Sequence, residues 1–129
     1  MLFLYIAAGG ALGTVARFAL SGWVYDRAGA GFPWGTLAVN VAGSLLIGFV
    51  LRMLDVMAVT PEMRGFLTVG LLGGFTTFST YTWETVTLAR EGQWAAAGSY
   101  SIGSLLLGVL AVLVGVAAAT LLIRLRIQP

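Results

Sequence analysis

The sequence contains no cysteine and no histidine among its 129 residues, and all seven of its basic residues are arginines. Without cysteine the chain has no disulfide framework and no thiolate nucleophile, and without histidine it lacks the usual imidazole base and metal ligand. No other combination of a nucleophile with a base, or of metal-binding side chains, stands out in the sequence. The sequence therefore argues against an enzyme.

Charge is scarce as well. Charged residues make up 9% of the chain and hydrophobic residues 59%, whereas soluble proteins carry about 25% charged residues. Such a composition cannot cover a water-facing surface, so it indicates an integral membrane protein in contact with lipid. The arginines are scattered rather than clustered, which argues against a nucleic-acid partner.

Four long apolar segments account for most of the chain, and they cover residues 2–25, 34–54, 63–89 and 95–123. A helix that crosses a bilayer needs about 20 apolar residues, so each segment is long enough to cross once. Ahead of the third segment, Thr60, Pro61 and Glu62 have the pattern of a helix start, with Thr60 as the N-cap. We expect residues 1–129 to form a single all-α transmembrane domain of four helices.

The first segment combines small residues with one charge. Gly9 and Gly13 have the G-x-x-x-G spacing that lets two helix backbones approach closely in lipid. Arg17 would cost about 2.5–3.5 kcal/mol at the centre of a bilayer. Its side chain either reaches the interface from near the helix end, or lies at the mouth of an anion path, or ties down a neighbouring segment.

The second segment carries Asn40, four residues after Thr36 and therefore on the same helix face. A carboxamide without partners is strongly disfavoured inside a bilayer, so Asn40 is expected to face protein or water. One interpretation is a hydrogen bond between helices. We favour a place along a polar pathway, because Gly43, Ser44 and Gly48 continue a slim face nearby.

The third segment contains the most unusual stretch, Gly70 to Glu84, which reads G-L-L-G-G-F-T-T-F-S-T-Y-T-W-E. Each glycine in a helix costs about 1 kcal/mol relative to alanine, so we predict a break in mid-membrane between Gly73 and Thr76. Unwound backbone at that depth is tolerated where it is buried in protein or lines a cavity. Its free carbonyl oxygens suit a hard cation such as Na⁺. A kinked helix without an ion is the alternative.

Beyond the predicted break, Phe78, Tyr81 and Glu84 recur every three residues and share a helix face. Aromatic rings have positive edges, so rings presented edge-on would stabilise a small anion. Threonine and serine hydroxyls and the Asn40 amide would donate hydrogen bonds to the same anion. The alternative is ordinary packing of aromatic side chains between helices, and periodicity alone leaves both interpretations open.

The arginines are almost evenly divided between the two sides of the membrane. With four spans, three arginines lie on one side and four on the other, so the positive-inside rule gives no firm orientation. A chain that inserts both ways can pair with itself, and a single chain leaves little interior for a water-accessible path. We therefore expect an antiparallel, dual-topology homodimer. The two sets are Arg17, Arg27 and Arg90, and Arg52, Arg64, Arg124 and Arg126.

Three motifs give the chain a family resemblance. They are G-A-L-G-T-V-A-R-F from Gly10 to Phe18, G-T-L-A-V-N-V-A-G-S from Gly35 to Ser44, and G-G-F-T-T-F-S-T-Y from Gly73 to Tyr81. Together with the length and the four apolar segments, they resemble the Fluc (CrcB) family of bacterial fluoride channels. The third motif is highly specific, and the likeness extends over essentially the whole chain.

The resemblance implies a function and an assembly. It implies a passive, fluoride-selective channel in the bacterial inner membrane, through which the cell lowers its cytoplasmic fluoride. It also implies an antiparallel homodimer with two pores and a central structural Na⁺.

The resemblance further implies roles for particular residues. The backbone carbonyls of Gly73 and Thr76 would hold the Na⁺, and Arg17 would lie near a vestibule. Phe78 and Tyr81 would occupy the two aromatic positions along the fluoride path. Polar residues implied along that path are Asn40, Ser79, Thr80, Tyr100 and Ser104.

Tyr81 departs from the family pattern, which has phenylalanine at the second aromatic position. Tyrosine keeps the ring edge and adds a hydroxyl that can itself bond an anion. We therefore expect conduction to survive, with an effect on rate and ion preference.

Two other functions stay open at this point. A proton-coupled small multidrug exporter is also a four-helix antiparallel dimer, but it needs a membrane-embedded carboxylate, typically in its first helix. The first segment here has no acid before Asp26, and Glu84 is the only carboxylate within a span. A non-transporting membrane assembly subunit would leave the buried polar stripe unexplained.

Overall fold

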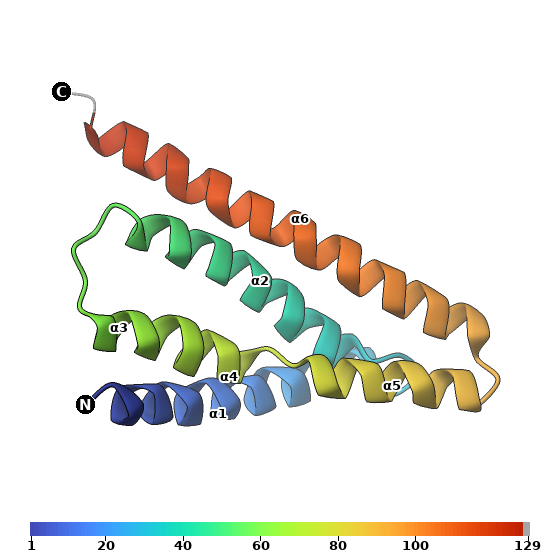
Figure 1. Ribbon diagram of the computed structural model, residues 1–129. Coiled ribbons are helices and arrows are strands. Elements are labelled where there is room, and N and C mark those ends of the chain that lie inside the picture. The colour runs from blue at the N-terminus through green and yellow to red at the C-terminus, as the bar shows by residue number, and fades with distance from the viewer. Residues whose placement is uncertain (128–129) are drawn as a thin grey trace.

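The computed structural model describes residues 1–127, and all of its secondary structure is helical (Figure 1). The all-α prediction is confirmed for this range. The third segment of the chain includes a π-helical stretch, η1. The elements are α1 (Leu2–Ala28), α2 (Trp34–Leu54), α3 (Pro61–Gly65), η1 (Phe66–Leu72), α4 (Gly73–Phe75), α5 (Phe78–Arg90) and α6 (Trp94–Ile127).

Three of these helices, α1, α2 and α6, are long and apolar enough to cross a membrane. The region from α3 to α5 covers a similar length but is divided into shorter helical pieces. Figure 1 shows the N-terminus and the end of α6 at the same end of the molecule, which is the arrangement that four passes require. The fold is that of a multi-pass membrane protein.

Helix α2 packs against α6 and also against α1. Helix α6 lies along α2, while α1 lies along the pieces from α3 to α4 (Figure 1). Glycines allow the close approach between α2 and α6, because a Cβ at Gly48 would collide with the Val112 carbonyl and one at Gly115 with the Leu45 carbonyl. Gly48 was expected beside a polar pathway, and the structure instead places it in this backbone-to-backbone contact.

The predicted close approach at Gly9 and Gly13 is confirmed. A Cβ at Gly13 would overlap the Leu71 carbonyl, and Gly9 lies equally tightly against η1. On the facing side, a Cβ at Gly70 would lie 2.6 Å from the Ile6 carbonyl oxygen and one at Gly74 2.8 Å from the Gly10 carbonyl oxygen. The small residues of α1 therefore allow the third segment of the same chain to pack closely against α1.

The start of the third segment is also as predicted. The Thr60 side chain accepts a hydrogen bond from the Met63 N–H at 3.2 Å, and Pro61 occupies the first turn together with Glu62. This cap supplies a partner for one of the amide donors that a helix start leaves free.

The interruption of the third segment lies further along than the sequence indicated. Gly73 and Gly74 are helical, with Gly73 at φ −65° and ψ −37°. The extended residues are Thr76, at φ −87° and ψ 160°, and Thr77, at φ −148° and ψ 121°. Assigning the break to the glycines was wrong because Gly74 serves the contact with α1, and the chain leaves the helix only after Phe75.

Candidate ion pathway

Asn40 of α2 holds the interruption by pairing with the backbone of Thr77. Its Nδ2 donates to the Thr77 carbonyl at 2.9 Å, and its Oδ1 accepts from the Thr77 N–H at 2.8 Å. The carboxamide thus satisfies both backbone groups of an extended residue, as a neighbouring β-strand would. This matters in lipid, where an unpaired backbone group is costly. A hydrogen bond between helices was one of the two interpretations of Asn40 in the sequence. The structure contains such a bond, from α2 to the residue that precedes α5.

Arg17 of α1 ties down the other extended residue. Its Nη1 donates to the Thr76 carbonyl at 3.3 Å, and the side chain is half-buried. Of the three interpretations left open by the sequence, the one in which Arg17 holds a neighbouring segment is confirmed.

Thr77 also caps α5. Its Oγ1 accepts from the Thr80 N–H at 3.2 Å and donates to the Thr80 hydroxyl at 3.0 Å, and Ser79 Oγ lies 3.5 Å away. This cap was not predicted from the sequence, although threonine is among the preferred N-cap residues. The amino end of α5, with its partial positive charge, thus faces the interruption.

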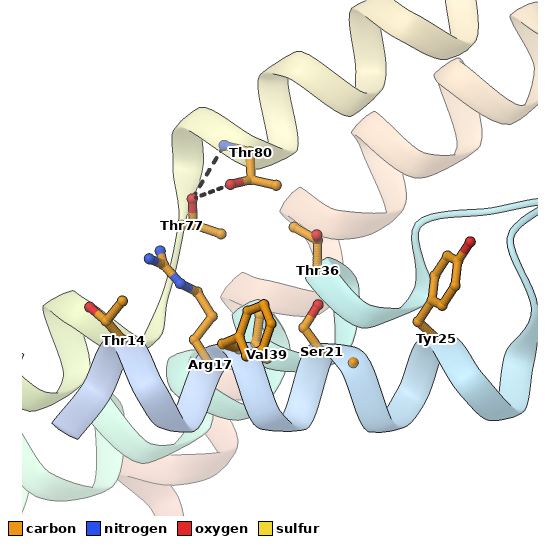
Figure 2. A pocket seen from close by; sticks show the side chains of 10 residues that line it. Thr14, Arg17, Ser21, Tyr25, Thr36, Val39, Thr77 and Thr80 are labelled. Atoms are coloured by element: carbon orange, nitrogen blue, oxygen red, sulfur yellow. Dashed lines mark hydrogen bonds between the residues drawn. The ribbon is translucent and has the colours of Figure 1, made fainter. Parts of the chain in front are cut away.

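Arg17, Ser21, Thr36, Thr77 and Thr80 border a pocket of about 360 Å³, called here the Arg17 pocket. Figure 2 shows the Arg17 side chain rising from α1 toward Thr77 and Thr80. One guanidinium group and several hydroxyls therefore share one hollow beside the amino end of α5. Such a site favours an anion over a cation.

Glu84 joins three helices through its carboxyl group. Oε1 accepts from the Thr36 hydroxyl at 2.8 Å, and Oε2 accepts from the Tyr100 hydroxyl at 2.7 Å. Thr36 is 4% exposed and Tyr100 1% exposed, so the cluster is shielded from the outside. The cluster could not be predicted from the sequence, because no spacing along the chain relates α2, α5 and α6.

The aromatic side chains form a row next to this cluster. Phe78 and Tyr81 have ring centroids 5.6 Å apart, Tyr81 and Tyr100 5.4 Å, and Tyr100 and Phe32 5.4 Å. Phe78 and Tyr81 are therefore neighbours on one face of α5, as their spacing predicted.

The Tyr81 hydroxyl forms hydrogen bonds with Ser101 of α6. It lies 3.1 Å from the Ser101 carbonyl oxygen, to which it donates, and 3.1 Å from the Ser101 hydroxyl oxygen. From the sequence, this hydroxyl was expected to be able to bond an anion. In the structure it bonds Ser101.

A groove of about 730 Å³ runs between α5 and α6 and is called here the α5–α6 groove. Asn40, Phe78, Tyr81 and Ser104 border it. Among residues 1–126, Ser104 Oγ is the buried side-chain polar atom that lacks a hydrogen-bond partner. The Asn40 amide has two N–H groups and gives one of them to Thr77. The groove thus combines aromatic side chains with uncommitted donors, which suits a ligand that only accepts hydrogen bonds.

The Gly73 and Thr76 carbonyls, which the family resemblance implies as Na⁺ ligands, differ from each other in their hydrogen bonds. The Gly73 carbonyl has lost its regular helical donor, because the Thr77 N–H is bonded to Asn40 instead. The Thr76 carbonyl accepts from Arg17, which leaves one lone pair. Within residues 1–126, no group of three or more acidic, histidine or cysteine side chains could hold a metal. Carbonyl oxygens with a free lone pair are present in this region, and oxygens of this kind suit a hard cation.

Comparison with known proteins gives consistent matches over most of the chain. Residues 4–116 match the family model described as CrcB-like protein, Camphor Resistance (CrcB). A relative from Opitutus terrae named "Fluoride-specific ion channel FluC" is 51% identical over 121 residues, which cover 92% of each chain. Relatives with the same name come from Thermus thermophilus, 50% identical over 113 residues (88% of this chain, 89% of the relative), and Rhizobium meliloti, 47% identical over 115 residues (88% and 92%).

Proposed function

The chain belongs to the CrcB-like family, as its three motifs predicted, and from that premise we propose that it is a fluoride-selective channel that lets fluoride leave the cell passively. The curated relatives are named for ion conduction and not for catalysis. All three of those relatives come from bacteria, which fits a place in the bacterial inner membrane.

The observation that carries the proposal is the uncommitted hydroxyl of Ser104 in the α5–α6 groove. A buried hydroxyl without a partner costs about 1–3 kcal/mol, so its presence calls for a ligand. The second Asn40 N–H is a further donor at the same groove. A bare anion supplies the acceptor that both of these groups lack.

Fluoride suits these surroundings because it is the smallest halide and the strongest hydrogen-bond acceptor among them. Phe78 and Tyr81 border the groove, and the edges of aromatic rings carry partial positive charge. A ring edge attracts an anion without binding it as tightly as a full positive charge would. Conduction needs such a balance, in which binding is favourable enough to admit the ion and weak enough to release it.

A second copy of the chain would complete the path and the cation site. Phe78 is 77% exposed although it borders the groove, so the groove has an open side. An antiparallel partner placed there would supply the missing wall and generate two equivalent pores. The Gly73 and Thr76 carbonyls from both copies would then surround one Na⁺, with two carbonyl oxygens from each chain. The cation would fasten the two subunits together.

Proton-coupled drug export would require Glu84 to exchange protons with a substrate. Both of its carboxyl oxygens accept hydrogen bonds from Thr36 and Tyr100, so the group has a fixed structural environment. The channel is the better supported function.

Replacement of Ser104 tests the proposal in liposomes loaded with fluoride. We expect Ser104→Ala to slow fluoride efflux, and Ser99→Ala to leave it unchanged. Ser99 is the matched control because it is exposed on the same helix and bonds the Ala96 carbonyl of its own turn. Equal efflux from both variants would refute a role of the Ser104 hydroxyl in the pathway.

A further inference from the structure

We infer that Ser101 is a positioning residue, which fixes the ring of Tyr81 at the edge of the α5–α6 groove through the Tyr81 hydroxyl. The inference rests on the proposed function, since it concerns how this chain orients one of the two aromatic residues of its path. It gives Ser101 a role that neither its place in the sequence nor the family motifs indicated.

The two hydrogen bonds between the residues are complementary. The Tyr81 hydroxyl donates to the Ser101 carbonyl oxygen at 3.1 Å, and its own oxygen accepts from the Ser101 hydroxyl, also at 3.1 Å. A tyrosine hydroxyl has one hydrogen to donate. The phenol hydrogen is therefore committed to α6 and is not available to an anion in the groove.

Ser101 behaves differently from a serine that serves only its own helix. Ser99, one half-turn earlier on α6, bonds the Ala96 carbonyl at 3.1 Å, which is the common local arrangement. The Ser101 hydroxyl instead reaches across to α5. The contact therefore joins two helices at the level of the aromatic row.

The ring of Tyr81 needs such a restraint because packing alone leaves it loosely oriented. The χ2 torsion of tyrosine has a broad energy profile. On one side the ring contacts Tyr100, which is 1% exposed and fixed by Glu84, and on the other it contacts Phe78, which is 77% exposed. The tether at the hydroxyl sets which edge faces the groove, and it limits the freedom of Phe78 as well.

The inference is tested with Tyr81→Phe, Ser101→Ala, Ser101→Thr and the control Ser99→Ala, all reconstituted in liposomes. We expect Ser101→Ala to lower the ratio of fluoride to chloride efflux by about two- to tenfold, the effect of one neutral hydrogen bond. Tyr81→Phe removes both hydrogen bonds and should lower the ratio at least as much. Ser101→Thr keeps the hydroxyl and should retain the wild-type ratio. The double variant, Tyr81→Phe with Ser101→Ala, should be no worse than Tyr81→Phe, because Tyr81→Phe already removes the hydrogen bond that Ser101→Ala removes.

A spectroscopic measurement follows the hydrogen bond without transport. The tyrosine Fermi doublet in Raman spectra reports phenol hydrogen bonding, and its intensity ratio should change in Ser101→Ala but not in Ser99→Ala. An unchanged doublet, or an efflux ratio in Ser101→Ala equal to that of Ser99→Ala, would overturn the positioning role. If the wild-type protein moves no fluoride, the proposed function fails, and the Raman comparison still decides whether Ser101 tethers Tyr81.

Discussion

Asn40 and Thr77 are joined by two hydrogen bonds that run in opposite directions, at 2.9 and 2.8 Å, across the 37 residues that separate them in the sequence. A single side chain thus replaces the helical partners that Thr77 lost when the chain became extended. Arg17 does the same for the Thr76 carbonyl. The interruption of the third segment is therefore built by side chains of α1 and α2, and not by the glycines that precede it.

Replacement of Asn40 by alanine should destabilise the protein. Two buried backbone groups of Thr77 would lose their partners, and we expect a loss of about 2 kcal/mol or more in the free energy of unfolding. Chemical denaturation in detergent measures the change. Thr68→Ala is the control, since the Thr68 hydroxyl bonds only the Arg64 carbonyl of its own helix. A loss in Asn40→Ala no larger than in Thr68→Ala would contradict the pairing with Thr77.

Replacement of Gly13 by alanine should disturb the contact between α1 and η1. The added Cβ would overlap the Leu71 carbonyl, which is backbone and cannot rotate away. We expect a destabilisation of about 1–3 kcal/mol, as for overpacking in a tight interior. Gly98→Ala is the control, because its Cβ meets nothing within 4 Å. Thermal unfolding in detergent should show a lower midpoint for Gly13→Ala, and an unchanged midpoint would argue against this packing.

Removal of the charge at Arg17 should slow fluoride transport at low ionic strength. The guanidinium borders the Arg17 pocket, and a positive charge at such a place is expected to raise the local concentration of anions. We expect Arg17→Gln to reduce fluoride efflux by about tenfold in dilute buffer, with a smaller difference at high salt because of screening. Arg90→Gln removes an exposed arginine at the end of α5 and serves as the control. A reduction that is the same at both salt concentrations would contradict the electrostatic role.

The sequence predicted the helical fold well, because composition and the lengths of the apolar segments determine it. It also predicted the close packing at Gly9 and Gly13 and the N-cap at Thr60, since these depend on neighbours along one helix. The glycine at 74 was misinterpreted because a glycine weakens a helix and permits a close contact equally well, and Gly73 is helical without any such contact. Only the arrangement of α1 distinguishes the two uses.

Less of the candidate site than of the fold could be predicted from the sequence. Periodicity placed Phe78 beside Tyr81, but it could not pair Glu84 with Tyr100 or Tyr81 with Ser101, which lie on different helices. Thr77 carried a usable signal, because threonine at a helix start commonly bonds an amide of the first turn, as it does here with Thr80. The resemblance implied the ion, and the place proposed for it beside the uncommitted donors of the groove rests on the structure.

The central claim is tested most directly by ion-selective electrodes on liposomes that contain the purified protein. With a potassium ionophore to balance charge and no proton gradient, we expect rapid fluoride efflux and no chloride efflux above that of protein-free liposomes. The same fluoride efflux should persist when a proton gradient is imposed in either direction. Equal efflux of chloride, or fluoride movement that requires a proton gradient and is lost in Glu84→Gln, would contradict a passive fluoride-selective channel.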